Sequence, residues 1–418
     1  MSRRKCLKTI STAPGGNVRI QVLTTGNELL SGRRTDEHLS WIARAVESHG
    51  MEVAYHATVG DNYERIVEEL KLSAARADVC IMTGGLGPTE DDQTRPAVEE
   101  AFHRPLQFDA KLWKTIQDRF RKYKIKMAPT NRRQAFRPKG SAALSNPVGS
   151  APGFRLKSDG LQLFCLPGPS REMRGMFQKS VLPMLLRQQN QKWDSWEGFA
   201  VGLPEADLDS ILTKVVGGGV RYGLTVHRGI VTISLKSSGL GRQKKLKALS
   251  QKVKKALGHH FLERSLAEEV THLLLDRRRT IAIAESCTGG LIGHKLTDLP
   301  GISAALLEAM VVYSNRSKEK RLGVPASLVK KHGAVSSEVA EAMAEGIVQE
   351  TGASIGLATT GIAGPSGGTA KKPVGLVYSA VSCNGITRVS HRVFPGDRSE
   401  VKERASNFAL NMVRRALV

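Results

Sequence analysis

Short apolar runs alternate with longer amphipathic segments in the first half of the chain. The apolar runs have the length of buried strands, and the segments between them carry apolar residues at helical spacing. In chain order, the predicted elements are a strand at 17–25, a helix at 38–49, a strand at 52–59, a helix at 64–76 and a strand at 78–82. Strands that alternate with helices form a parallel sheet with helices on both faces. The pattern therefore predicts a doubly wound α/β domain over residues 18–190.

The pattern changes after residue 190. Strand-like and helix-like segments no longer alternate regularly, and they end in a lysine-rich helix at 242–255. The other predicted elements are a strand at 198–202, a helix at 204–216, and strands at 222–227 and 230–235. We expect a small α+β module over residues 191–262, too small to carry much chemistry of its own.

The last third of the chain predicts a second α/β domain, over residues 263–418. Ser265 and Glu268 have the spacing of a capping box, which opens a helix that reaches Leu275. The further elements are a strand at 280–283, a helix from 289, a helix begun by Ser336, strands at 354–359, 374–382 and 388–394, and a helix from 398 to about 417. We expect the last two strands to be antiparallel.

Length and composition agree with a multidomain globular protein. A chain of 418 residues is too long for one ordinary core. Residues 1–17 are basic and then glycine-rich, and we expect a disordered lead-in rather than a signal peptide. No run of 18 apolar residues is present, so we expect no membrane span. Five scattered cysteines without a CxxC pair argue for a reducing compartment and against a zinc site, and we expect a cytoplasmic protein.

The formal net charge of +23 raises the question of a nucleic-acid partner. Basic residues gather at 111–139 and at 242–255. In the second stretch, lysines surround apolar residues at helical spacing, which favours a solvated outer face over a DNA-binding surface. Only 5% of the residues are aromatic, too few for stacking on single strands. We expect nucleic-acid binding to be weak and electrostatic if it occurs, with a general attraction for anionic metabolites as the milder alternative.

A glycine-rich loop at 83–87 follows the strand at 78–82. Such a loop lets backbone N–H groups approach a phosphate closely. Asp91 and Asp92 come next, and their carboxylates have the chemistry to hold a hydrated Mg²⁺ against a pyrophosphate or to activate water. A tight turn followed by an acidic helix start explains the same residues, and the pattern alone leaves both interpretations open.

Ser286 stands between the strand at 280–283 and the helix from 289. A serine on such a turn presents its hydroxyl beside helix-end N–H groups, which suits a nucleophile next to an oxyanion or phosphate site; the alternative is a helix cap. The nucleophile needs a base, and no histidine lies in these loops, so we expect Lys318 in a Ser–Lys arrangement. To act near neutral pH, the lysine pKa must fall from about 10.4 to about 8.

Three further features belong to this candidate site. Tyr313 lies five residues before Lys318 and has the chemistry to relay its proton or to orient it. The loop at 360–368 is able to cradle a phosphate or an oxyanion, and Arg398, at a helix start, is able to fork onto a phosphate. Each residue alone also has a structural explanation: Lys318 as a surface lysine, Tyr313 as a core ring and Arg398 as a salt-bridge partner.

Five motifs of the first domain resemble, in order and spacing, the N-terminal half of the CinA family of competence/damage-inducible proteins, and the glycine loop resembles that of molybdopterin-binding domains. The motifs are 26–32 (GNELLSG), 59–62 (VGDN), 83–94 (TGGLGPTEDDQT), 146–149 (NPVG) and 166–169 (LPGP). The resemblance implies a pterin-like nucleotide site, associated in CinA relatives with ADP-ribose pyrophosphatase activity, for which we expect a divalent metal such as Mg²⁺. Its residues would be Gly26, Glu28, Thr83, Gly84, Gly85, Gly87, Asp91, Asp92 and Thr94, with Asp92 as the metal ligand.

Five motifs of the last domain resemble the C-terminal domain of the same family, a nicotinamide-nucleotide amidase that turns nicotinamide mononucleotide into the acid and ammonia. They are 284–290 (AESCTGG), 313–318 (YSNRSK), 333–336 (GAVS), 360–365 (TGIAGP) and 372–375 (KPVG). The resemblance implies Ser286 as nucleophile, Lys318 as base and Tyr313 as its partner, without a cofactor. The implied substrate site consists of Thr288, Gly289, Thr360, Gly361, Gly364 and Arg398.

The middle module resembles the KH-type insert of CinA relatives, which invites an RNA interpretation. No GxxG loop stands between its helices, so we reject RNA as a partner. We predict a homodimeric enzyme of pyridine-nucleotide salvage that acts on nicotinamide mononucleotide and ADP-ribose. Two alternatives stay open: a non-catalytic binding protein of DNA uptake or repair, and a protein that binds or transfers molybdopterin.

Overall fold

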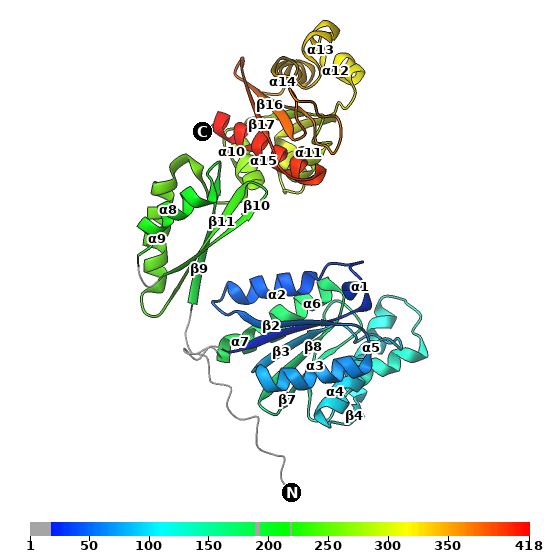
Figure 1. Cartoon of the computed structure of the whole chain (residues 1–418). Coiled ribbons are helices and arrows are strands. Elements are labelled where there is room, and N and C mark those ends of the chain that lie inside the picture. Colours follow the sequence, from blue (N-terminus) through cyan, green and yellow to red (C-terminus); the bar gives the residue numbers. More distant parts are fainter. Residues whose placement is uncertain (1–17, 189–192, 218–219) are drawn as a thin grey trace. The chain divides into compact units, whose positions relative to one another are not determined.

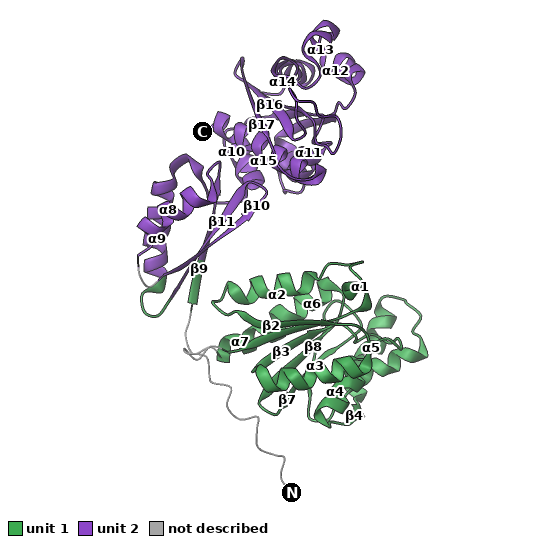
Figure 2. Cartoon of the chain, in the orientation of Figure 1, with its two compact units in different colours: residues 1–195, 238–242 green, residues 196–237, 243–418 purple. Residues whose placement is uncertain are grey.

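The computed structural model of the chain describes residues 18–188, 193–217 and 220–418 (Figure 1). The predicted disordered lead-in, residues 1–17, lies outside the described residues. The chain forms two compact units, 1–195 with 238–242 and 196–237 with 243–418 (Figure 2). Most of the middle module belongs to the second unit, and the three-domain division stays a prediction. Within the described residues, no helix is long and apolar enough to cross a membrane.

The first unit is built on a six-stranded sheet in the order β2-β1-β3-β8-β7-β6. Strands β2, β1, β3 and β8 run parallel, and the pairs β8–β7 and β7–β6 are antiparallel. The strands are β1 (Ile20–Thr25), β2 (Val53–Val59), β3 (Val79–Thr83), β6 (Ala142–Leu144), β7 (Gly153–Ser158) and β8 (Leu161–Leu166). The loops that the sequence marks as functional follow the carboxyl ends of the parallel strands, where α/β proteins bind ligands.

Helices cover both faces of this sheet, as the alternation predicted. Successive residues of β1 point to opposite faces, so that Val22 packs with α2 and α6 and Leu23 packs with α3 and α4. The helices are α1 (Asn27–Leu30), α2 (Glu37–Glu47), α3 (Tyr63–Arg76), α4 (Thr94–Phe102), α5 (Ala110–Lys122), α6 (Ser170–Met176) and α7 (Leu182–Gln188). A two-stranded ribbon of β4 (Leu106–Phe108) and β5 (Phe136–Pro138) completes the unit. The predicted α/β class is confirmed.

The middle module is a four-stranded sheet in the order β10-β11-β9-β12, with two helices packed on it. Its elements are β9 (Trp193–Val201), α8 (Glu205–Val215), β10 (Arg221–His227), β11 (Ile230–Ser238), α9 (Arg242–Leu257) and β12 (Phe261–Leu262). On α9, Leu246, Leu249 and Val253 are buried, whereas Lys244 and Lys252 are exposed. The lysine-rich helix therefore has the solvated outer face that its pattern predicted.

The C-terminal domain contains a five-stranded sheet in the order β14-β13-β15-β16-β17. Its strands are β13 (Ile281–Glu285), β14 (Leu306–Val311), β15 (Ile355–Gly361), β16 (Leu376–Cys383) and β17 (Ile386–Val393). Strands β14, β13 and β15 run parallel, and β16 and β17 form the predicted antiparallel pair. The carboxyl ends of β13 and β15 therefore lie side by side and bring together the loops after Glu285 and Gly361.

Two groups of helices enclose this sheet. Helices α10 (Leu266–Asp276), α11 (Leu291–Thr297) and α15 (Arg398–Leu417) pack with Ile281 and Ile283. Helices α12 (Asn315–Leu322), α13 (Ala326–His332) and α14 (Ser337–Thr351) pack with Ala282 and Ala284, on the other face. The predicted capping box between Ser265 and Glu268 begins α10.

Candidate active sites

Ser286 lies directly after β13, on the turn into α11. Its N–H donates to the Thr359 carbonyl at 3.0 Å, and the Thr288 and Thr359 hydroxyls are 2.8 Å apart. The buried Glu285 carboxylate accepts two N–H groups from the first turn of α11. Gly290, at φ +89°, provides the left-handed residue that this turn needs. The turn is thus held from both sides, which fixes the position of the Ser286 hydroxyl.

Lys318 reaches Ser286 from α12. Its Nζ lies 3.0 Å from Ser286 Oγ, 3.0 Å from the Val312 carbonyl oxygen and 3.1 Å from the Tyr313 carbonyl oxygen. The lysine is only 1% exposed. The structure therefore brings together the serine and the lysine that stand 32 residues apart in the sequence.

The environment of Lys318 favours its neutral form. Burial lowers the lysine pKa from its ordinary value of 10.5, with a smaller opposite effect from Cys287. A neutral amine has two N–H donors and one lone pair. The two donors match the carbonyls of Val312 and Tyr313, and the lone pair is left for the Ser286 O–H. This arrangement suits a lysine that accepts the serine proton.

Cys287 is the other nucleophile on the turn. Burial raises the pKa of its thiol to about 12. The thiolate is the reactive form of cysteine, and a thiol with this pKa stays protonated near neutral pH. Of the two side chains, the Ser286 hydroxyl is therefore the better candidate for a nucleophile.

The Tyr313 side chain does not face Lys318. It is 59% exposed, and its hydroxyl accepts a hydrogen bond from Arg398 Nη2 at 2.8 Å. The Tyr313 backbone carbonyl is the group that contacts Lys318. Of the two predicted roles, orientation of the lysine is the one this geometry supports, and it acts through the main chain.

A cavity of about 280 Å³ opens beside Ser286. The predicted residues Thr360, Gly361, Gly364 and Arg398 line it, together with Ser286 itself. A second cavity of about 540 Å³ shares Gly364 and Arg398 with the first. Arg398 Nη1 donates to the Gly364 carbonyl at 2.7 Å. The guanidinium therefore stands where the two cavities meet, with its charge available to an anionic ligand.

Two residues predicted for the substrate stand behind the cavity wall. Thr288 is buried against Thr359, and the Gly289 N–H donates to the Ser286 carbonyl at 3.2 Å. Neither is among the residues that line the cavity. In this structure, Thr288 and Gly289 shape the turn, and direct contact with substrate stays a prediction.

Other residues of the site were not predicted. Asn315 lines the cavity, and Lys372 Nζ donates to the His332 and Val335 carbonyls at 2.7 and 2.6 Å, which fixes the loop before α14. Glu285 caps α11. Glu285 is the last residue of β13 and not the residue before α11, and the Lys372 contacts join segments about 40 residues apart, so neither role has a local sequence signal.

The predicted glycine loop of the first unit follows β3. The Gly84 N–H donates to the Leu166 carbonyl at 3.0 Å, and the Thr94 hydroxyl donates to the Gly84 carbonyl at 2.9 Å. Gly84 has φ +104°, and a Cβ there would collide with Thr25 at the end of β1. The Thr83 hydroxyl lies 2.9 Å from His38 Nδ1. The loop is thus packed against β1, α2 and α4, and His38 is a polar neighbour that the sequence did not reveal.

Asp92 holds the loop in shape. Its Oδ1 accepts the Gly87 N–H at 2.7 Å, and its Oδ2 accepts the Thr89 N–H and hydroxyl at 2.8 and 2.6 Å. Gly85 packs against Thr94, so that no side chain fits at that position. This supports the tight-turn interpretation of the Asp92 pattern, and Oδ1 keeps one acceptor site beyond these bonds.

Four acidic residues gather at this edge of the sheet. Burial raises the pKa of Asp61, and the charges of Glu28, Asp91 and Asp92 raise it further. The loop that begins at Gly26 joins the cluster, since the Asp61 carboxylate accepts a backbone N–H of that loop at 3.0 Å. In the described part of the chain, no three histidine, cysteine or carboxylate side chains converge as a complete metal site. These residues fit a divalent cation that takes its remaining ligands from substrate phosphate and water.

Comparison with known proteins gives two family matches. Residues 21–187 match the family described as Probable molybdopterin binding domain, and residues 263–417 match the CinA C-terminal domain. A Halothermothrix orenii protein named as competence-damage inducible is 39% identical, over 91% of this chain and 94% of its own length. A Clostridioides difficile protein of the same name is 36% identical, over 95% of this chain and 99% of its own length. The crystal structure of a competence/damage-inducible protein from Agrobacterium tumefaciens is 38% identical over 36% of this chain and 93% of its own, with a TM-score of 0.35.

Proposed function

The chain belongs to the CinA family, and we propose that its C-terminal domain hydrolyses the carboxamide of nicotinamide mononucleotide at Ser286, with Lys318 as the base. The CinA C-terminal domain is associated with amidase activity. The observation that carries the proposal is the contact of 3.0 Å between a buried lysine amine and the hydroxyl of a serine held on a strand-to-helix turn.

The chemistry follows from the hydrogen bonds of Lys318. The neutral amine takes the Ser286 proton while Oγ attacks the amide carbon and forms a tetrahedral intermediate. The resulting ammonium is held by the carbonyls of Val312 and Tyr313, and it returns its proton to the amide nitrogen, which leaves as ammonia. Water then attacks the acyl-serine ester, with the same amine taking its proton. The ammonium gives that proton to Ser286 Oγ as the ester bond breaks, which releases the pyridine carboxylate and restores the serine and the neutral amine.

Arg398 gives the site its preference for a nucleotide. Its guanidinium lies at the mouth of the cavity, and the described residues place no carboxylate within ion-pair distance of it. A phosphate there would receive a charge-assisted pair of hydrogen bonds. The pyridine carboxamide would then lie toward Ser286 and the phosphate toward Arg398.

We expect the purified protein to release ammonia from nicotinamide mononucleotide, and far more slowly from nicotinamide riboside. In Arg398→Gln, this preference for the phosphorylated substrate should fall by about 10-fold or more, because a charge-assisted contact is lost. The rates with both substrates, measured on wild type and variant, test the assignment. Equal preference in both proteins would place the phosphate elsewhere, and no ammonia from either substrate would refute the proposed function.

The rate should rise with pH. The active form of Lys318 is neutral, and a lysine pKa that lies below 10.5 makes this form available at lower pH than for an exposed lysine. We therefore expect kcat/KM to increase with pH and to level off below the ordinary lysine pKa. In Lys318→Arg, the charge is permanent, and the pH-dependent activity should disappear. A flat profile in the wild type, or a midpoint at or above 10.5, would contradict a buried lysine base.

For the first unit we propose a second activity, the hydrolysis of ADP-ribose to AMP and ribose 5-phosphate. Two features support it: a glycine loop at the carboxyl ends of the parallel strands, and the acidic residues Glu28, Asp61, Asp91 and Asp92 around it. A divalent cation, when bound, would neutralise pyrophosphate charge. Asp91 is the exposed carboxylate next to the loop and the residue we assign to hold the cation, while Asp92 keeps the loop folded.

We propose nucleic-acid binding only as a weak electrostatic property of exposed lysines such as Lys244 and Lys252.

A further inference from the structure

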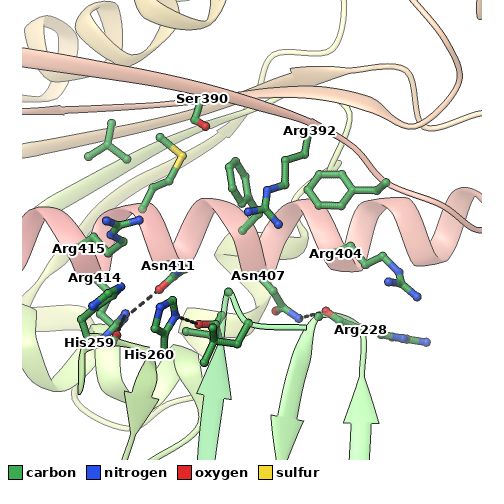
Figure 3. Close-up of a pocket in the computed structure, with 18 of the residues that line it drawn as sticks. Arg228, His259, His260, Ser390, Arg392, Arg404, Asn407, Asn411, Arg414 and Arg415 are labelled. Atoms are coloured by element: carbon green, nitrogen blue, oxygen red, sulfur yellow. Dashed lines mark hydrogen bonds between the residues drawn. The ribbon is translucent and has the colours of Figure 1, made fainter. Parts of the chain in front are cut away.

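A larger cavity, of about 840 Å³, lies within the second unit, between the middle module and the C-terminal domain (Figure 3). The domain contributes β17 and α15, and the module contributes residues 201–204, the turn at Arg228, and His259 with His260. Protein ligand pockets are about 300–1,000 Å³. The cavity shares no lining residue with the one beside Ser286, so it is a separate site.

The lining of this cavity is strongly cationic. It includes two histidines and no aspartate or glutamate, and its arginines are Arg228, Arg388, Arg392, Arg404, Arg414 and Arg415. Arg228 pairs with Glu403 at 2.8 Å. For the other five arginines, the described residues offer no carboxylate within ion-pair distance. The pKa of His259 is lowered by its neighbour His260 first and also by Arg415 and Arg414, which agrees with a positive potential here.

Two of these cations are poorly compensated. Arg414 is only 5% exposed, and its guanidinium donates to neutral oxygens, the Asn411 side chain at 3.0 Å and the His259 carbonyl at 2.6 Å. Burial lowers its pKa, and the charge of Glu269 opposes this shift. Arg404 has a buried Nε without an acceptor among the described residues. A buried cation such as Arg414 and a buried donor such as Arg404 Nε are unfavourable unless an anion joins them.

The polar groups follow one face of α15. The residues of this helix that line the cavity lie on one face, because each has another three or four positions away; they are Arg404, Asn407, Phe408, Asn411, Met412, Arg414, Arg415 and Ala416. Arg404 and Arg414 are ten residues apart, or about 15 Å along the axis. Figure 3 shows Arg404 and Arg228 toward one end of the cavity, Arg414 and Arg415 toward the other, and Arg392 between them. An extended ligand would meet cations along its length.

The wall of the cavity also offers an aromatic surface. The Arg392 guanidinium lies 5.2 Å from the centroid of the Phe408 ring, and Phe394 makes an edge contact with that ring at 5.8 Å. Nucleobases stack on rings and guanidinium planes of this kind. An aromatic surface beside a row of cations matches a ligand that has one base and several phosphates.

We propose that this cavity binds a nucleoside polyphosphate, with its phosphates on the arginines of β17 and α15 and its base against Phe408 and Arg392. The ligand would also fasten the middle module to the C-terminal domain. Two hydrogen bonds already join them beside the cavity, from Asn407 Nδ2 to the Arg228 carbonyl at 3.0 Å and from Arg414 to the His259 carbonyl. The assignment does not depend on the reaction at Ser286.

Calorimetric titration of the full chain with ATP and with inorganic triphosphate, at about 0.15 M salt, tests the site. We expect Arg392→Gln/Arg404→Gln to weaken ATP binding on the order of 30-fold, because the Arg404 contact with phosphate and the Arg392 guanidinium under the base are both lost. The matched control, Lys244→Gln/Lys252→Gln, removes the same charge from the exposed face of α9 and should change the affinity by less than about 3-fold. Phe408→Leu should weaken ATP binding and leave triphosphate binding unchanged.

Photolabelling with 8-azido-ATP separates this cavity from the other nucleotide sites, and we expect the label on residues 388–394 or 404–416 and not on the residues around Ser286 and Arg398. Unchanged thermal unfolding without ligand shows that the arginine variants fold. An equal loss of affinity in the lysine control would mean general charge attraction and overturn the proposal. Triphosphate binding as tight as ATP in the wild type would refute the base contact. Single-stranded DNA that binds more tightly and cannot be displaced by ATP would assign the cavity to nucleic acid instead.

Discussion

Replacement of Ser286 by alanine is expected to lower the turnover of nicotinamide mononucleotide on the order of 10³-fold or more, because the nucleophile is removed. The fold should persist. Lys318 Nζ keeps two of its three hydrogen-bond partners, the carbonyls of Val312 and Tyr313, and the contact between the Ser286 N–H and Thr359 belongs to the backbone. Ammonia release under saturating substrate is the measurement, with circular dichroism to check the fold.

Lys318→Ala should cost nearly as much, and the double variant little more than either single one. A nucleophile and its base act as one unit, so their contributions do not add. Lys320→Ala is the matched control, since Lys320 is an exposed residue of the same helix. More than about a tenth of the wild-type rate in Ser286→Ala would mean that no acyl-serine forms. Additive losses in the double variant would mean that Lys318 acts apart from Ser286.

The pairing of Ser286 with Lys318 was accessible from sequence because each residue lies at a recognisable local feature. Ser286 follows a buried apolar strand and precedes a glycine turn, and a serine without a histidine nearby needs another base. The structure adds contacts of the Lys318 amine that the spacing of residues in the sequence does not reveal. The two carbonyls that hold the amine belong to Val312 and Tyr313, at the end of an edge strand, β14, that the apolar pattern did not predict. Strand β14 is mostly exposed, so it lacks the continuous burial that marks β13.

The role of Tyr313 shows a second limit of sequence reasoning. A tyrosine five residues before a lysine suggests that the ring serves the lysine. In the structure, the chain turns between β14 and α12, so that the carbonyl of Tyr313 points to Lys318 while its hydroxyl meets Arg398, 85 residues later. The spacing of residues in the sequence identifies which residues belong to the candidate site. The direction of each side chain depends on the backbone between them, and on contacts with distant segments.

The cavity beside the middle module is a feature that the sequence analysis did not predict. The module is small by itself, and its sequence gave no reason to expect a ligand. The cationic cavity exists because Arg228 and His259 from the module face Arg404 and Arg414 from α15. The basic stripe of α15 is visible in the sequence only as ordinary helical charge, since a solvated face and a cavity wall have the same pattern.

In the first unit, we expect chelation to abolish the cleavage of ADP-ribose and to leave ammonia release unchanged. The candidate site contains carboxylates that fit a substrate-bound divalent cation. The reaction proposed at Ser286 uses a hydroxyl and an amine, and neither needs a metal. Both rates are measured on one preparation with excess EDTA, and then after Mg²⁺ is restored. Equal loss of both activities would contradict this division between the two sites.

Substitutions of Asp91 and of Asp92 test which of the two is a metal ligand and which one holds the loop in shape. Asp92→Asn should abolish ADP-ribose cleavage, because an amide nitrogen would face N–H donors where the carboxylate now accepts from Gly87 and Thr89. Added Mg²⁺ should not restore activity, and protease should cut the loosened loop. Asp91→Asn leaves those bonds intact, so it should raise the Mg²⁺ concentration needed for half-maximal rate by about 10-fold or more without loosening the loop. If Asp91→Asn behaves like wild type while Asp92→Asn recovers at high Mg²⁺, Asp92 is itself the metal ligand, as the sequence first suggested.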